Sequence, residues 1–180
     1  DPLEFAVAKA SLGMAYAVLC FSGLVSERSK AISCLQEAEQ HTSPDVEQFR
    51  YASIMDIIGR AYLHLADDYE TALTKAIECF QQALRFFSPE FHPYGHAEVQ
   101  MELGLAFAWS ANDQNDNIER AITCHRQALH IFTPEATPGD HQWAAGSLGK
   151  IHFSQRQWRQ AHSSYRQAIN TSQNLYQSAS

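Results

Sequence analysis

The sequence predicts an all-α protein, an α-solenoid of stacked antiparallel helix pairs with about four repeats. Three groups of residues recur at a nearly constant interval along the 180-residue chain. Glycines that follow an apolar residue step by 46, 45 and 45 residues, at Gly13, Gly59, Gly104 and Gly149. Similar nine-residue segments place alanines at Ala31, Ala76, Ala121 and Ala161, and Ser-Pro or Thr-Pro pairs step by 45 residues, ending at Pro44, Pro89 and Pro134. A fixed period of this length is typical of helical repeats.

Each repeat is expected to contain two helices. Apolar residues in the second helix of repeat two share one helical face: Ala76, Ile77, Phe80, Ala83, Leu84 and Phe87. The first helix of that repeat has the same pattern at Ile54, Ile57, Ile58, Ala61, Tyr62 and Leu65. Because no useful length of sequence alternates with a period of two, we expect no strands. The chain is therefore expected to form a single array over 1–180, with repeats at about 3–43, 44–88, 89–133 and 134–177.

Small residues predict how the paired helices pack. A glycine inside a helix costs about 1 kcal/mol relative to alanine, so four glycines in register indicate that a second helix approaches closely there. The recurring prolines Pro44, Pro89 and Pro134 are expected in the first turn of the next helix, where the missing N–H is not needed. Pro138, after Thr137, is expected to begin the first helix of repeat four in the same way.

Composition excludes several classes of protein. With 45% hydrophobic residues the chain is too apolar to be disordered. Its 13 Lys and Arg against 20 Asp and Glu give a net charge of −7, which argues against nucleic-acid binding. Four cysteines are ordinary intracellular usage, and no signal peptide opens the chain, so we expect a cytoplasmic protein. Since the sequence does not begin with Met, we expect a fragment of a longer protein.

Residues Leu3–Phe21 are the one stretch that suggests a membrane span. Glu4 and Lys9 interrupt its apolar run. A buried helix of a soluble protein is therefore the preferred interpretation, and no membrane is expected among the partners.

The recurring residues resemble the tetratricopeptide repeat (TPR) over nearly the whole chain. That family's pattern is Trp-x2-Leu-Gly-x2-Tyr, then Ala-x3-Phe, a further Ala and a Pro. The Tyr position holds Tyr16, Tyr62, Phe107 and His152, and the Phe position holds Leu35, Phe80, His125 and Tyr165. The Trp position departs from the pattern, with Lys9, Met55, Gln100 and Ala145.

The first three repeats are longer than the family pattern by roughly five residues between their helices, at 22–28, 67–71 and 112–117. In this they are similar to the long TPR-like repeats found beside caspase-like (CHAT) proteases. HEAT-type helix pairs share the period and are the alternative architecture, but the paired Gly and Ala positions favour the TPR.

No catalytic set is evident, and we expect neither an enzyme nor a cofactor. Cys34, Cys79 and Cys124 share a register, but equivalent helices in stacked repeats lie about 10 Å apart, too far for zinc or a disulfide. They are interpreted as small core residues. His92 and His96 have the spacing of a metal pair, but Pro93 is expected to place His92 at a helix cap. His125 is expected to be a hydrogen-bonded interior residue.

The resemblance implies a ligand groove lined by the first helices. The positions that it marks give an apolar patch beside sparse charges, at Met14, Asp56, Arg60, His64, Met101, Leu105, Trp109, Lys150 and Phe153. The family's Lys and Asn clamp for a C-terminal carboxylate is not expected, because Asn is missing from these positions. A protein or peptide partner, as an amphipathic helix or extended chain, is expected there. The alternative is that these residues are partly exposed parts of the scaffold.

The leading function is therefore a scaffold for protein–protein interaction. The alternative is a regulatory or sensor module of a larger signalling protein such as a caspase-like (CHAT) protease. The first helix is apolar around most of its circumference, which predicts that a preceding repeat, a neighbouring domain or a second copy of the chain covers it.

Overall fold

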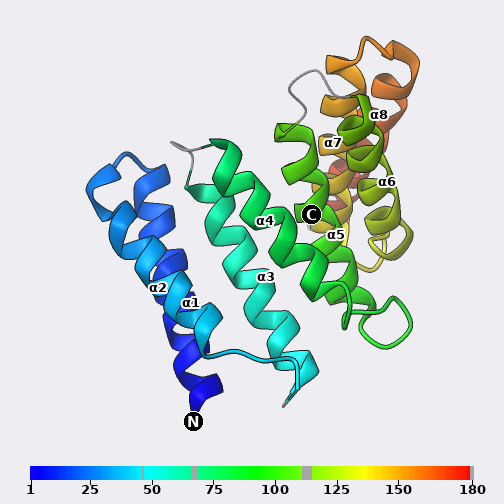
Figure 1. Ribbon diagram of the computed structural model, residues 1–180. Coiled ribbons are helices and arrows are strands. Elements are labelled where there is room, and N and C mark those ends of the chain that lie inside the picture. The colour runs from blue at the N-terminus through cyan, green and yellow to red at the C-terminus, as the bar shows by residue number, and fades with distance from the viewer. Residues whose placement is uncertain (46, 66–68, 111–114, 179–180) are drawn as a thin grey trace. The chain divides into compact units, whose positions relative to one another are not determined.

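The computed structural model of the protein describes residues 1–45, 47–65, 69–110 and 115–178, and these are helical with no strand, which confirms the all-α prediction (Figure 1). Over this part of the chain the elements are α1 (Pro2–Phe21), the short 3-10 helix η1 (Val25–Glu27), α2 (Arg28–Gln40), α3 (Gln48–His64), α4 (Tyr69–Ala83), α5 (Pro93–Trp109), α6 (Asn115–Ile131), α7 (Pro138–Ser154) and α8 (Trp158–Ser178). The expected repeat boundaries near residues 44, 89 and 134 fall in the loops before α3, α5 and α7.

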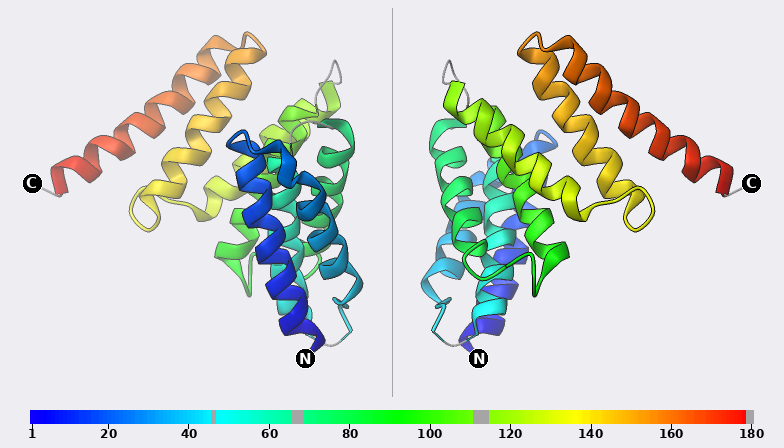
Figure 2. Two further views of the ribbon diagram at one scale, coloured as in Figure 1. Left: turned by 90° about the vertical axis from the view of Figure 1, so that its left-hand side faces the viewer. Right: turned by 90° about the vertical axis from the view of Figure 1, so that its right-hand side faces the viewer.

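The chain divides into two compact units. The first, Asp1–Phe91, holds α1 to α4, and the second, His92–Ser180, holds α5 to α8. In the first unit α1 packs against α2 and α3, and α3 packs against α4. In the second unit α5 packs against α6, α6 against α7, and α7 against α8, the last two forming a long hairpin in both views of Figure 2. Consecutive helices α1–α2, α3–α4, α5–α6 and α7–α8 therefore form hairpins.

A glycine lies at the contact between the two helices of every hairpin. A Cβ atom built on Gly13 would lie 2.7 Å from Leu35 Cδ2, and one on Gly59 would lie 2.7 Å from Phe80 Cε1. In the second unit a Cβ on Gly104 would meet the ring of His125, and one on Gly149 would lie 2.8 Å from the ring of Tyr165. The close approach predicted from the glycine register is confirmed in each hairpin.

Helix starts follow the expected use of proline in part. Thr137 is the N-cap of α7 and Pro138 begins the helix, as predicted. In α1 the Asp1 carboxylate caps the helix by accepting a hydrogen bond of 2.9 Å from the Leu3 N–H. The prediction was wrong for Pro44, Pro89 and Pro134, which lie in loops ahead of α3, α5 and α7. Ser-Pro and Thr-Pro here form turns, because the helix that follows begins four residues after each proline.

Helix α1 is only half buried, although a buried helix was expected. Ala6, Ala10 and Ala17 are fully buried against the rest of the first unit. The opposite side is exposed, with Leu12 44% exposed. By length and composition alone α1 is the one helix in the described ranges that could cross a membrane, a test that core helices of soluble proteins also pass. The extra residues expected after this helix form a turn with η1; those expected at 67–71 and 112–117 fall partly on 66–68 and 111–114, outside the described residues.

His125 is an interior residue with a backbone partner, as predicted. It is fully buried, and its Nδ1 lies 2.9 Å from the Ala121 carbonyl oxygen, one helical turn earlier in α6. Burial lowers the pKa of His125, because the charged imidazolium loses its hydration; the hydrogen bond to Ala121 opposes this effect. The ring is therefore neutral at pH 7.

We predict opposite effects of two Gly→Ala substitutions in α7. Gly146→Ala should stabilise the protein by up to about 1 kcal/mol, since the new Cβ meets open space and alanine favours the helix. Gly149→Ala should destabilise it by about 1–3 kcal/mol, because the Tyr165 ring occupies the site. Urea unfolding followed by circular dichroism measures both. Equal stability of the two variants would show that the ring moves aside at negligible cost.

We also predict that His125 makes the fold sensitive to acid. The folded pKa lies below the unfolded value near 6.5, so this contribution to stability is complete above pH 6.5 and is lost as the pH falls below it. His125→Phe, which copies the residue type of Phe80, removes the effect. Between pH 6.5 and 5.5 the wild type should lose up to about 1.4 kcal/mol more than the variant. Parallel pH profiles for the two proteins would contradict this; all other histidines cancel in the comparison.

Candidate functional site

In the first unit, two of the predicted groove residues form an ion pair on α3. The Arg60 guanidinium lies 2.6 Å from Asp56 Oδ2, one turn away in the same helix. The Asp56 side chain is only 10% exposed and that of Arg60 is 35% exposed. Because the two charges neutralise each other, this pair presents little net charge to a ligand, and Arg60 is not a ready anchor for an anionic group.

His64 and Met14 contribute apolar surface rather than charge. The His64 ring packs edge-on against Phe21 of α1, with 5.4 Å between ring centroids. Burial and the nearby positive charge of Arg60 both lower the pKa of His64, so the ring is neutral at pH 7. Met14 is half-buried on α1.

In the second unit, α5 holds three of the predicted residues, and Met101 lies in the core, contrary to its predicted place in the groove. Met101 is 9% exposed and packs in a cluster with Ala97 of α5, Ala128 of α6, Phe132 directly after α6 and Ala144 of α7. Leu105 is half-buried, and Trp109 at the end of α5 is 39% exposed. The side chain of Met101 fills space between helices, because the residues facing it in α6 and α7 are alanines.

The two predicted residues on α7 belong to a stripe along one side of the helix whose side chains are exposed. We define the α7 stripe as Trp143, Gly146, Lys150 and Phe153, whose steps of 3, 4 and 3 residues place them on one side of the helix. Gly139, Gln142 and Ser147, together with the first three members of the stripe, line a hollow of about 370 Å³. A Cβ atom built on Gly139 or on Gly146 would meet open space, so these two glycines help to leave the hollow open next to Trp143.

Aromatic surface dominates the α7 stripe. Trp143 is 42% exposed and Phe153 is 56% exposed. The Phe153 ring packs edge-on against Trp158 at the start of α8, with centroids 5.2 Å apart. Sequence reasoning missed Trp143, although its position seven residues before Lys150 placed it two turns along the same face.

A second hollow lies between α6, α7 and α8, and it was not predicted. It has a volume of about 770 Å³, and its walls include Arg126, His130, Gln160, Ser163, Gln167 and Asn170. Within it, Nδ1 of His141 lies 2.9 Å from Thr171 Oγ1. We call it the polar hollow because most of its lining side chains are polar, although Leu129, Pro134 and Leu148 also line it. The α7 stripe, in contrast, combines aromatic rings with one lysine.

The corresponding place in the first unit is much smaller. A hollow of about 220 Å³ lies there, lined in part by Tyr51, Met55 and Cys79. His141 and Ala145 lie eight and four residues before Gly149, as Tyr51 and Met55 lie before Gly59, so they occupy equivalent positions. Smaller side chains thus open the hollow in the second unit.

The shared-register cysteines lie inside the protein, as predicted. Cys34, Cys79 and Cys124 are between 4% and 7% exposed. Burial raises the pKa of Cys79 to about 12 and that of Cys124 to about 11, so their thiols stay protonated and unreactive near pH 7. His92 is the N-cap of α5, as predicted. No group of three or more His, Cys, Asp or Glu suited to a metal ion occurs among the residues that the structure covers.

Comparison with known proteins leaves the family open. No protein-family model matches this chain, and no curated protein is similar to it in sequence.

Proposed function

We propose that the chain is a helical-repeat array of tetratricopeptide type that binds another protein, with the α7 stripe as an anchor for the partner. The proposal for the architecture is supported by the four hairpins and by the glycine in each of them. These glycines meet Leu35, Phe80, His125 and Tyr165, each of which lies four residues after the recurring alanine of its second helix. The function rests on one observation, the exposed aromatic stripe with its hollow on α7.

The chemistry of the α7 stripe suits a peptide or helix with an apolar side chain next to an acidic one. Trp143 and Phe153 are large, rigid apolar surfaces of the type that dominates binding energy at protein interfaces. The hollow between Trp143 and Lys150 would receive the apolar side chain, and the exposed ammonium of Lys150 would pair with the acidic group. In an amphipathic helix the two groups would stand three or four residues apart.

The stripe is a better candidate than the larger hollow between α6 and α8. Most of the side chains that line that hollow are polar, and these remain hydrogen-bonded to water in the free protein and gain little on binding. Exposed aromatic rings, in contrast, gain free energy when a partner removes them from water.

We predict that Trp143→Ala weakens peptide binding at least tenfold, because truncating a central aromatic anchor typically costs about 1.4 kcal/mol or more. Peptides would be selected on the full chain from a displayed random library, and their affinities measured by fluorescence anisotropy. Lys150→Glu should weaken mainly those peptides that carry an acidic residue.

Two variants serve as matched controls. Phe91→Ala removes another exposed aromatic ring, 79% exposed, and should leave binding unchanged. Ser163→Trp fills the polar hollow and should also leave binding unchanged. Peptides that lose affinity with Ser163→Trp but not with Trp143→Ala would place the binding site in the polar hollow instead.

A further inference from the structure

We infer that the exposed side of α1 is a docking surface for a helical hairpin, which would pack on α1 as α1 and α2 pack on α3. The α1 face consists of Phe5, Ala8, Leu12, Ala15 and Leu19. All five residues are exposed, and the three large side chains are each between 40% and 44% exposed. The inference concerns the opposite end of the chain from the α7 stripe and does not depend on it.

The sequence register shows what kind of surface the α1 face is. Gly13 and Gly59 occupy the same place in their hairpins, each against the second helix, and they are 59 − 13 = 46 residues apart. Adding 46 to the positions of the α1 face gives Tyr51, Ile54, Ile58, Ala61 and Leu65. All of these residues are buried, the last four being at most 2% exposed. The α1 face is thus the equivalent of a surface that is covered on α3.

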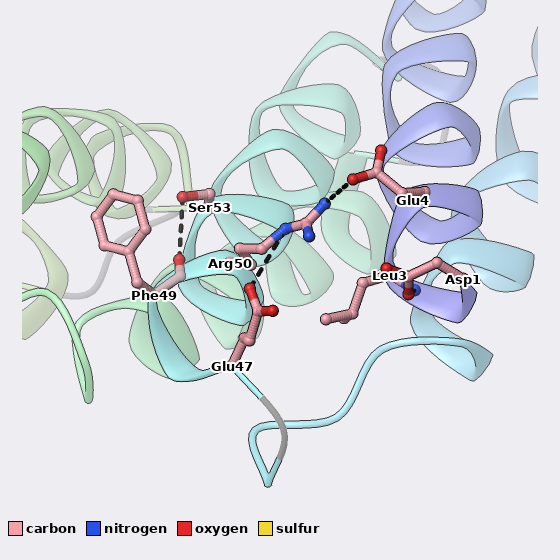
Figure 3. Close-up of polar contacts among 7 residues, drawn as sticks. All are labelled: Asp1, Leu3, Glu4, Glu47, Phe49, Arg50 and Ser53. Carbon is pink, nitrogen blue, oxygen red and sulfur yellow. Dashed lines mark hydrogen bonds and ion pairs between the residues drawn. The ribbon is translucent and has the colours of Figure 1, made fainter.

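On α3 this surface is covered by the preceding hairpin. Ile54, Ala61 and Leu65 lie about 120–160° around the helix from Gly59, and so on the side away from α4. Among the described residues of the first unit, the other helices that contact α3 are α1 and, to a small extent, α2. At the start of α3, Arg50 reaches α1 and lies 2.5 Å from Glu4 Oε1 (Figure 3). Near its end, His64 packs on Phe21. Helix α1 therefore runs along the full length of α3.

Charge gives the partner a further feature. Arg50 and Glu4 are themselves 46 residues apart, so Glu4 stands on α1 where Arg50 stands on α3. A hairpin docked in the same manner places its own residue of that position next to Glu4, whose side chain is 67% exposed beside Arg50. A basic residue there, followed by small and medium apolar residues like Ala10 and Met14, is the complementary chemistry.

The other occupants fit the α1 face less well. A second copy packed α1 to α1 would bring no basic residue at position 4, because it carries Glu4 there. A membrane-spanning α1 would have to bring Lys9 into the bilayer and break its ion pair of 2.8 Å with Glu37 of α2. It would also have to pull the buried side of the helix away from the first unit. A docked hairpin can carry a basic residue next to Glu4 and leaves α1 packed in the first unit, since it reproduces the contact already present between α1 and α3.

The test supplies such a hairpin to the complete chain. Residues 1–46 with Glu4→Arg are fused ahead of Asp1, which keeps the 46-residue spacing between the two copies of Gly13. In the original α1, Leu12→Cys should then react with a maleimide at least tenfold more slowly than in the unextended chain with the same substitution. The midpoint of thermal unfolding should also rise, and the rise should be smaller when the added hairpin keeps Glu4.

Leu12→Glu with Leu19→Glu in the original α1 is the matched control. Because both side chains are exposed, the unextended double variant should keep its helical circular dichroism. In the extended chain the double variant should lose the gain in thermal stability. Unchanged labelling of Leu12→Cys in a folded extended chain would overturn the inference.

Two further outcomes would replace the hairpin by another occupant. If the unextended chain sediments as a dimer that Leu12→Glu with Leu19→Glu dissociates, the α1 face binds a second copy. If the unextended chain co-sediments with phosphatidylcholine vesicles and the same double variant does not, the α1 face binds a membrane. Trp143→Ala should change neither result, so failure here and failure of the α7 stripe are distinguishable.

Discussion

The close approach of two helices at a glycine is the constraint on which every hairpin depends. Each glycine gives up about 1 kcal/mol of helix propensity, and each is matched by a large side chain from the second helix that fills the space a Cβ would take. Burying an apolar side chain such as Leu35 or Phe80 contributes about 1.5–3 kcal/mol, which more than offsets the cost. Residues on the remaining faces are then free to differ between hairpins, and they do.

Local patterns in the sequence were sufficient for the helices and their pairing. The 3.6-residue spacing of apolar residues identified the helices, and the glycine register identified the face on which Gly59 meets Phe80. The hydrogen-bonded interior position of His125 followed from its register with aromatic residues. The helix starts predicted at Pro44, Pro89 and Pro134 were wrong, because a Pro after Ser or Thr suits a turn as well as a helix start, and only the length of the following loop distinguishes the two.

The candidate site was less predictable, because the exposure of a residue depends on the neighbouring helix. Met101 and Gly146 stand at equivalent positions, three residues before the recurring glycine of α5 and of α7, yet the first is in the core and the second lines a hollow. What buries Met101 is the set of alanines and Phe132 around it, and these lie up to 43 residues away in the sequence. The hollow beside Trp143 likewise arises from two glycines whose surroundings only the folded chain reveals.

The turns that connect the two helices of a hairpin are not subject to the close approach that the glycine imposes on the helices themselves. After α1 the chain turns through Gly23, whose φ is +102° and whose Cα has open space beside it, and then through η1. Between α7 and α8 the turn is much shorter, with Arg156 at a φ of 56°. The helices of both hairpins meet at a glycine in the same way although the two turns differ in length. The length of the turn therefore does not change how the two helices pack. The turn at Gly23 is accordingly a suitable site for inserting a reporter or an affinity epitope, because an insertion there leaves the packing of the helices unchanged.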